Sequence, residues 1–347
     1  MFQKLQVVEK GKDFERCTKI NSYPIPDHVE EGYVLVRNHY AGVNATDLTS
    51  TQNVYGPQYT VPYDFGLEAV GEVVLLGEGV QHLTVGDPVA VYWPGGYAEY
   101  QVAPATVCQR IPRLDPIYLT VNVSGLTAAV ALGEVAQPKP SDTALVTAAA
   151  GGTGSIAVQL LKKKYKCKCV VGTCSTPEKA DYLVSIGCDK VINYKVSEEE
   201  LAAEMDRAAP HGFDVVYECV GGTLQRLAVQ HLAVRGRIVF IGGISGYADG
   251  TAWQCSTDTV DERSTEYAML HKNFLLLRSA SAMGFMLPTY REVIPTYFAD
   301  LVRMLDAGEL HVRLDPNGQK EGLQHVKEAV DYLSSGKSYG KNTVRLV

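Results

Sequence analysis

The fold is decided by a glycine-rich stretch in the middle of the chain, Val146-Thr147-Ala148-Ala149-Ala150-Gly151-Gly152-Thr153-Gly154-Ser155-Ile156-Ala157. Its order is that of a buried strand, a tight turn and the start of a helix. Glycines let the backbone of such a turn approach a pyrophosphate, and the helix N-terminus adds unpaired N–H groups and a positive dipole end. The stretch predicts a dinucleotide site, although any tight strand-to-helix turn can use glycine, so the motif needs its context.

Strand-like and helix-like segments alternate around this turn. The expected strands are Thr143–Thr147, Cys167–Thr173, Val191–Tyr194, Asp214–Glu218, Arg237–Ile241 and Phe274–Ser279. The expected helices between the earlier strands are Ser155–Tyr165, Thr176–Ile186, Ser197–Arg207 and Leu224–Ala233. Thr176 before Pro177, and Ser197 before three glutamates, are signals of helix N-termini. Repeated strand–helix units predict an α/β domain with a doubly wound parallel sheet.

The two ends of the chain have a different pattern. Short strand candidates at Tyr33–His39, Gly71–Leu76 and Pro88–Tyr92 lie between Gly, Pro and Asn turns, which is typical of a mainly antiparallel β domain. After Met286 we expect two amphipathic helices and a last strand that returns to the β domain, at Ile294–Ala307, Gly322–Ser335 and Asn342–Val347. The predicted β domain therefore comprises residues 1–124 and 288–347, and the nucleotide domain, residues 125–287, is inserted into it.

Composition narrows the class of protein. The 347 residues are 46% hydrophobic and 20% charged, as in an ordinary globular enzyme, and the net charge of −7 does not favour a nucleic-acid partner. We expect no membrane-spanning run and no signal peptide, and hence a cytoplasmic protein. The eight cysteines are scattered without a Cys-x-x-Cys pair. Cys167 and Cys169 share a strand face that could hold a metal, but small apolar residues of a reduced protein are the simpler interpretation.

Six motifs in order connect the chain to a known family. They are AGVNATD (41–47), GLEAVG (66–71), VGDPV (85–89), GYAEY (96–100), AAAGGTG (148–154) and SGKSYGK (335–341). With them the chain resembles the medium-chain dehydrogenase/reductase superfamily over its whole length, in the quinone oxidoreductase branch, and is most similar to the prostaglandin reductase 3 group. The resemblance implies a GroES-like β domain, an inserted Rossmann domain, and a homodimer paired through the last strand of the nucleotide sheet, here Phe274–Ser279.

The zinc ligands of the superfamily are replaced. Zinc-dependent members carry Cys where this chain has Asn44 and His where it has Leu67, and their structural zinc lobe needs four cysteines where only Cys108 occurs. We therefore expect no functional metal. Without a Lewis acid, alcohol–carbonyl interconversion loses its usual catalyst. Hydride addition to a carbon–carbon double bond conjugated to a carbonyl remains feasible, because hydrogen bonds can hold the developing enolate.

The second strand of the nucleotide domain bears on the choice of cofactor. NAD enzymes place an acidic residue at the end of this strand, whereas this chain reads Gly172-Thr173-Cys174-Ser175. By resemblance, Ser175, Lys179 and Tyr194 hold the 2′-phosphate of NADPH, although Lys179 could be a solvated helix lysine and Tyr194 a strand aromatic. A missing carboxylate and a nearby ammonium favour the phosphate.

The resemblance also implies the groups at the nicotinamide. It places Asn44 near the nicotinamide ribose, Thr127 near the carboxamide, and the backbone of Gly284-Phe285 against the nicotinamide. Gly242, which follows the fifth strand, is a further cofactor-binding candidate. Ser338 stands where family members often have an Asn that contacts the cofactor. Tyr247 is the candidate to donate a proton or stabilise an enolate, against the alternative of a loop aromatic. Tyr55, Trp253 and Tyr267 are candidates to line the substrate pocket, the last two in a segment, 250–270, that is either a lid or a surface insertion.

These observations predict an NADPH-dependent enzyme that reduces enones, and the family resemblance implies 15-keto-prostaglandin-like lipids or other enones as substrates. Hydride would reach the β-carbon, with Tyr247 and the nicotinamide ribose hydroxyl stabilising the enolate. Quinone reduction uses the same site with a flat acceptor. A cofactor-bound protein with a structural or binding role is a third alternative, because a fold does not fix a function.

Overall fold

The computed structural model describes residues 1–52, 59–247 and 273–347. Its contacts divide the chain into two compact units. The first comprises Met1–Ser124, Tyr247–Gly250 and Phe298–Val347, and the second comprises Gly125–Gly246 and Thr251–Tyr297. The domain boundaries expected from sequence stay a prediction; these units group residues 288–297 with the nucleotide domain instead.

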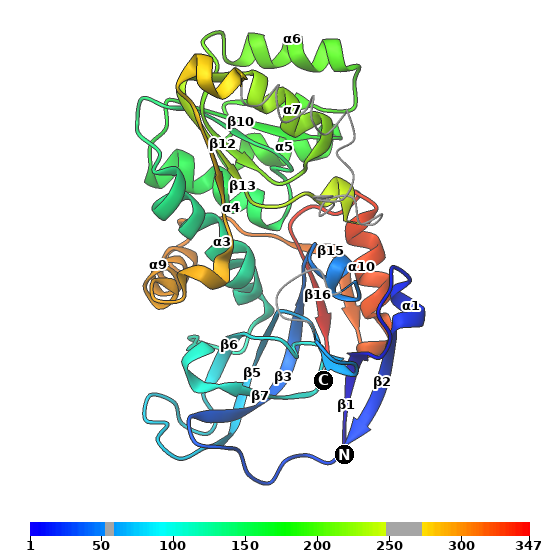
Figure 1. The fold of residues 1–347 in the computed structure, drawn as a ribbon. Coiled ribbons are helices and arrows are strands. Elements are labelled where there is room, and N and C mark those ends of the chain that lie inside the picture. Colours follow the sequence, from blue (N-terminus) through cyan, green and yellow to red (C-terminus); the bar gives the residue numbers. More distant parts are fainter. Residues whose placement is uncertain (53–58, 248–272) are drawn as a thin grey trace. The chain divides into compact units, whose positions relative to one another are not determined.

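The first unit is built on β-strands, drawn in blue, cyan and red in Figure 1. Its strands are β1 (Phe2–Val7), β2 (Thr18–Tyr23), β3 (Tyr33–Val43), β4 (Tyr63–Asp64), β5 (Glu68–Leu76), β6 (Pro88–Tyr92), β7 (Tyr100–Pro104), β8 (Cys108–Arg110), β15 (Leu314–Glu321) and β16 (Lys341–Arg345). Its larger sheet has the order β15-β16-β3-β5-β6-β8, with β7 also paired to β3, and its pairs are antiparallel except β15–β16. The helices are α1 (Phe14–Cys17), α2 (Asp47–Ser50) and α10 (Val326–Ser334), with short turns η1 (Ala105–Val107) and η9 (Leu323–His325). As expected, the last strand returns to the β sheet.

The second unit holds a six-stranded sheet of order β11-β10-β9-β12-β13-β14, and all its pairs are parallel. The strands are β9 (Thr143–Val146), β10 (Cys169–Cys174), β11 (Lys190–Asn193), β12 (Phe213–Glu218), β13 (Leu232–Phe240) and β14 (Ser281–Gly284). The helices are α3 (Leu126–Val130), α4 (Gly152–Gln159), α5 (Pro177–Ser185), α6 (Glu198–Ala208) and α7 (Gly222–Gln230), with short segments η5 (Leu160–Lys164), η6 (Ile244–Gly246) and η8 (Leu287–Tyr290). The helix α9 (Ile294–Asp306) contains the boundary between the units. The GroES-like and Rossmann folds are confirmed.

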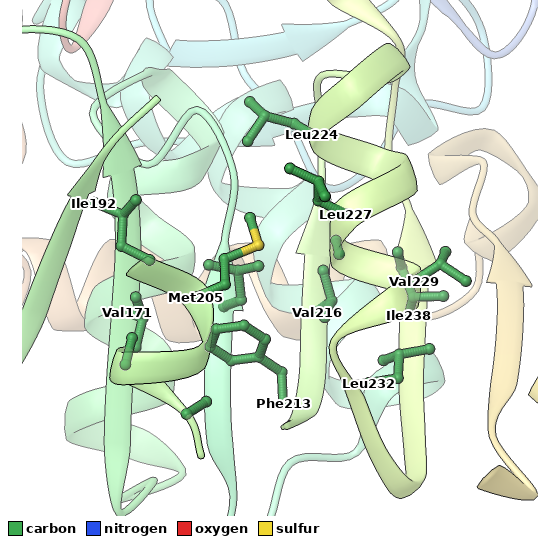
Figure 2. Close-up of a cluster of buried hydrophobic side chains, with 14 of the residues drawn as sticks. Val171, Ile192, Met205, Phe213, Val216, Leu224, Leu227, Val229, Leu232 and Ile238 are labelled. Atoms are coloured by element: carbon green, nitrogen blue, oxygen red, sulfur yellow. The ribbon is translucent and has the colours of Figure 1, made fainter. Parts of the chain in front are cut away.

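The helix signals in the sequence act as expected. The Thr176 side chain accepts a hydrogen bond from Lys179 N, and the Ser197 side chain accepts one from Glu200 N, so each satisfies an otherwise unpaired N–H of its helix. Leu201 and Met205 on α6, with Leu227 on α7, pack on one face of the parallel sheet in the core cluster that Figure 2 shows. These contacts fix the sheet that carries the glycine turn.

Two expected segments are wrong. Residues 273–278 are helical rather than a strand, and the edge strand of the sheet is β14. Leu276 and Leu277 are 71% and 81% exposed, which a buried strand would not allow. Periodicity cannot separate a strand from a helix in so short an apolar run. The expected helix Leu224–Ala233 ends at Gln230, because Leu232 already begins β13.

One helical run differs from the expectation that the chain has no segment long and apolar enough to span a membrane. The consecutive segments η2 (Pro116–Thr120), η3 (Val121–Gly125), α3 and η4 (Ala131–Ala136) form 21 residues that are long and apolar enough to cross a membrane by length and composition. The sequence predicts no such run. Of its most apolar window, 72% is buried inside the structure, as is usual for a core helix.

Candidate functional site

The glycine turn lies between β9 and α4, at the carboxyl end of the parallel sheet. Ala148 has a φ of +47°, a left-handed conformation that a non-glycine residue adopts at a cost of about 1 kcal/mol or more. A Cβ on Gly154 would lie 2.5 Å from the Ala148 carbonyl oxygen, so only glycine fits this packing. Among the described residues, no side chain caps the α4 N-terminus at Gly151. Its first N–H groups have no acceptor within the helix, which fits an anionic ligand.

Two of the candidate 2′-phosphate residues follow the ends of β10 and β11, and the third, Lys179, lies on α5. Cys174 pairs with Asn193 in these parallel strands, and Tyr194 N donates to the Cys174 carbonyl (3.1 Å). Ser175 and Tyr194 thus follow neighbouring strand ends. Lys179 is only 7% exposed. Burial raises the pKa of the Cys174 thiol, and the positive charge of Lys179 opposes this rise. Lys179 stands in the first turn of α5, five residues after the end of β10.

A buried carboxyl group lies at the end of β12, the strand that pairs with β9. Glu218 Oε1 accepts from Val220 N (2.7 Å), Gly221 N (2.9 Å) and Thr147 Oγ1 (3.3 Å). Burial raises the Glu218 pKa, and these hydrogen bonds oppose the rise. Glu218 Oε2 is buried and has no hydrogen-bond partner among the described residues. The contacts hold the loop between β12 and α7 at the sheet edge.

The remaining nucleotide-domain candidates lie at the same edge or on α3. Gly242 follows β13, and Gly284 ends β14 with open space where a Cβ would stand. Phe285 N donates to the Phe240 carbonyl (3.2 Å), so the backbone after β14 continues along β13. Thr127 lies on α3, half-buried, and α3 packs against α4. In open α/β sheets, ligands bind outside the carboxyl ends of the strands, and these candidates follow such strand ends.

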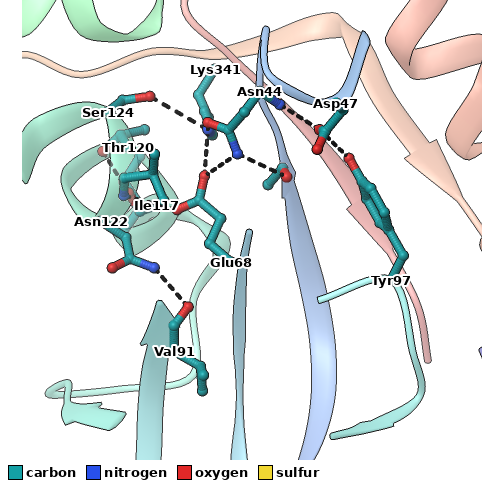
Figure 3. Close-up of polar contacts among 12 residues, drawn as sticks. Asn44, Asp47, Glu68, Val91, Tyr97, Ile117, Thr120, Asn122, Ser124 and Lys341 are labelled. Atoms are coloured by element: carbon teal, nitrogen blue, oxygen red, sulfur yellow. Dashed lines mark hydrogen bonds and ion pairs between the residues drawn. The ribbon is translucent and has the colours of Figure 1, made fainter. Parts of the chain in front are cut away.

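In the first unit, three strand ends bring a buried charged pair to Asn44. The strands β16, β3 and β5 are neighbours, and Lys341 begins β16, Asn44 follows β3 and Glu68 begins β5. Because neighbouring strands are antiparallel, these positions meet at one sheet edge. Lys341 Nζ lies 2.5 Å from Glu68 Oε1, with the side chains 3% and 0% exposed. Lys341 Nζ also donates to Asn44 Oδ1 (2.7 Å) and Ser124 Oγ (3.4 Å), as Figure 3 shows.

The Glu68 carboxylate is held on both oxygens. Oε1 accepts from Asn44 Nδ2 (3.0 Å), and Oε2 accepts from Val123 N (3.0 Å). A Cβ on Gly42 would lie 2.3 Å from Glu68 Oε1, so the carboxylate needs glycine at this position of β3. A buried ion pair is stable only when further hydrogen bonds satisfy its atoms, and this pair meets that condition.

A second buried carboxyl group, that of Asp47, supports the Asn44 backbone. Asp47 Oδ2 accepts from Asn44 N (2.8 Å) and from the Tyr97 hydroxyl (2.6 Å). Burial raises the pKa of Asp47 to about 6, against the hydrogen bonds from Tyr97 and Asn44 and the charge of Lys341. Asp47 Oδ1 is buried without a partner in the described part of the chain. Asp47 therefore orients the loop that carries Asn44.

The other candidates of the first unit are Tyr247 and Ser338. Tyr247 is 3% exposed, follows η6, and accepts at its carbonyl from Gln52 Nε2 (3.1 Å). Ser338 is half-buried in the turn before β16, three residues before Lys341. Tyr55, Trp253 and Tyr267, and the segment 250–270, lie outside the described residues.

The zinc suggested by family resemblance does not fit these residues. The Asn44 amide oxygen, at the position of a zinc ligand, accepts a hydrogen bond from the Lys341 ammonium at 2.7 Å. An ammonium at this distance repels a divalent cation, and the neighbouring Leu67 has no donor atom. Within the described ranges, no group of three or more His, Cys, Asp or Glu side chains could hold a metal ion.

Sequence reasoning missed several residues of these sites. Glu68 and Lys341 stand inside motifs that identify the family, but no role is assigned to them from sequence. A charged residue within an otherwise apolar strand end is a usable signal, since such a residue is almost never buried without a partner. Glu218, at the end of an apolar strand, carries the same signal.

Comparisons with known proteins agree with this geometry. A model described as "Zinc-binding dehydrogenase" matches residues 152–303, and one described as "Alcohol dehydrogenase GroES-like domain" matches 30–113. The chain is 49% identical over 345 residues to a "Probable quinone oxidoreductase" of Leishmania amazonensis, covering 99% of this chain and 98% of that protein. It is 41% identical to "Prostaglandin reductase-3" of Mus musculus, covering 99% and 89%. The structure of mycobacterial Rv1454c complexed with NADPH matches with a TM-score of 0.84 at 25% identity, covering 99% of this chain and 100% of that one.

Proposed function

Because this chain belongs to the medium-chain dehydrogenase/reductase superfamily and is an oxidoreductase of its quinone oxidoreductase-like branch, we propose that it reduces enones with NADPH. The substrate would be an α,β-unsaturated ketone, of the kind that 15-keto-prostaglandin-like lipids contain. When bound, NADPH supplies the hydride for the β-carbon. The protein binds and orients both ligands, excludes water and stabilises charge on the ketone oxygen.

The cofactor part of the proposal assigns the sheet edge of the second unit. The pyrophosphate would lie at the glycine turn, residues 151–154, where α4 begins without a side-chain cap. Ser175, Lys179 and Tyr194 would hold the 2′-phosphate. This is supported by the position of Ser175 and Tyr194 after two neighbouring strands, β10 and β11, and by the absence of a carboxylate at the end of β10 in the sequence. Thr127, Gly242, Gly284, Phe285 and, in the first unit, Asn44 and Ser338 would contact the nicotinamide half.

One observation carries the choice of reaction. The Lys341 ammonium lies 2.7 Å from Asn44 Oδ1 and repels a Lewis-acidic metal cation from this oxygen. Direct reduction of a carbonyl in this superfamily depends on such a metal, whereas reduction of a conjugated double bond requires only hydrogen bonds to the enolate. The 41% identity to a prostaglandin reductase supports the same reaction.

Tyr247 is our candidate for the enolate hydrogen bond. Its near-complete burial excludes water from the phenol, which strengthens a hydrogen bond to developing charge. Tyr55, Trp253 and Tyr267 remain candidates for the pocket wall on sequence grounds alone.

Quinone reduction is the second candidate function. It is favoured by the 49% identity to a probable quinone oxidoreductase, and the same cofactor site would serve it. Purified protein should be tested for NADPH oxidation with a panel of enones and quinones, followed by product analysis. Saturated ketones as products support the first function, and hydroquinones with no enone turnover support the second.

Two further properties are proposed with the function. We expect a homodimer paired along the sheet edge, which is β14 rather than the Phe274–Ser279 segment, and light scattering at micromolar concentration tests it. We also expect a cytoplasmic location. The cysteines of the described residues are free, which fits a reducing compartment.

A further inference from the structure

The hydrogen bonds around Asn44 determine what its side chain can offer a ligand. Both N–H groups of the amide are used, since Nδ2 donates to Glu68 Oε1 (3.0 Å) and the Gly42 carbonyl (3.3 Å). Oδ1 accepts from Lys341 Nζ (2.7 Å). An amide oxygen has two lone pairs, so one acceptor position on Oδ1 remains.

The orientation of this amide follows from charge. Turning it over would place Nδ2 against the Lys341 ammonium and Oδ1 against the Glu68 carboxylate and the Gly42 carbonyl. Donor would face donor and acceptor would face acceptor in a site where Asn44 is only 8% exposed. Lys341 and Glu68 thus hold the amide in one orientation. They also hold each other in place through the ion pair between Lys341 Nζ and Glu68 Oε1 at 2.5 Å.

We propose that Lys341, with Glu68, is a positioning residue that presents Asn44 to the cofactor only as a hydrogen-bond acceptor, where zinc-dependent members of the superfamily have a metal ligand. This inference rests on the proposed NADPH function. Asn44 then accepts a hydrogen bond from a hydroxyl of the nicotinamide ribose and cannot donate one to a substrate carbonyl. A hydroxyl whose single O–H is hydrogen-bonded to Asn44 cannot also donate a hydrogen bond to the substrate oxygen. Stabilisation of the enolate therefore falls more heavily on Tyr247.

The test compares two ligands in direct binding measurements, without turnover. NADPH contains the nicotinamide ribose, and adenosine 2′,5′-bisphosphate contains only the adenosine end. The variant Lys341→Met/Glu68→Gln removes both charges together, because removing one would leave the other buried and unpaired. The matched control Lys320→Met/Glu328→Gln removes an ion pair of the same type from the surface of the same unit. Thermal unfolding of each variant checks that it is folded.

We expect the variant to raise the dissociation constant of NADPH about five- to ten-fold, because one hydrogen bond is lost. The dissociation constant of the bisphosphate should change by less than two-fold. Asn44→Ala should weaken the binding of NADPH but not of the bisphosphate to the same extent, with the charged pair intact. This single variant therefore tests the inference even if the double variant does not fold. Adding Asn44→Ala to the double variant should cause less than a further two-fold loss, because the pair acts through Asn44.

Three results would overturn the inference: equal weakening of both ligands, unchanged NADPH binding, or a full additional loss on adding Asn44→Ala. Failure of the proposed function has a different signature. A wild-type protein that binds NADPH but reduces neither enones nor quinones contradicts that function and leaves the binding comparison intact.

Discussion

Asp47→Asn is the sharpest perturbation of the loop that carries Asn44. Asp47 is fully buried, and its pKa in the folded protein is about 6, against 3.8 for an ordinary aspartate. Between these values the folded state holds a proton that the unfolded state releases, so the stability of the wild type falls as the pH rises through this window. The raised pKa contributes at most roughly 3 kcal/mol to the free energy of unfolding, a limit reached at low pH. Of this contribution, about 1.4 kcal/mol is lost between pH 5.0 and pH 7.5.

The measurement is urea unfolding of both proteins at several values between pH 5.0 and pH 7.5. As the pH falls from 7.5 to 5.0, the free energy of unfolding of the wild type should rise by about 1.4 kcal/mol relative to that of Asp47→Asn, because asparagine does not titrate in this range. Asp181→Asn, which removes an exposed carboxylate on α5, controls for the change in net charge. A difference between wild type and Asp47→Asn that stays constant with pH would refute the claim that burial raises this pKa.

Three further predictions concern the cofactor, the chemistry and the metal. Lys179→Ala should raise KM for NADPH about ten-fold, or ~1.4 kcal/mol, and leave KM for NADH little changed; equal effects on both cofactors would argue against the 2′-phosphate assignment. Tyr247→Phe should lower kcat for an enone roughly ten- to hundred-fold, more than for a quinone, with NADPH affinity retained; unchanged enone turnover would make Tyr247 a loop aromatic. Chelator-treated protein should keep its activity with no stoichiometric zinc, and loss of activity on zinc removal would contradict the Lys341 account.

Local sequence signals predict the parallel sheet well. The glycine turn after residue 147 and the caps Thr176 and Ser197 act within a few residues of where they stand, so their structural effect can be read without knowing the fold. The run 274–279 shows where this reasoning fails. Its apolar residues suit a strand or a helix equally, and contacts outside the segment decide between them.

The buried network at Asn44 could not be derived from spacing. Lys341 lies 297 residues from Asn44 in the chain, and only the pairing of β16 and β3 with β5 brings both to Glu68. Family resemblance predicts that Asn44 replaces a zinc ligand, but only the fold identifies the ammonium beside it. The sequence does suggest that a lysine and a glutamate inside apolar strand ends need partners.

Transfer of deuterium tests the central claim most directly. The protein is incubated with an enone and NADPH that carries deuterium at the reactive position of the nicotinamide, and the product is examined by NMR and mass spectrometry. The account predicts a saturated ketone with one deuterium on the β-carbon and a solvent proton on the α-carbon. Deuterium on the carbonyl carbon of an allylic alcohol, or no deuterium transfer to an enone while quinones are reduced, would contradict it.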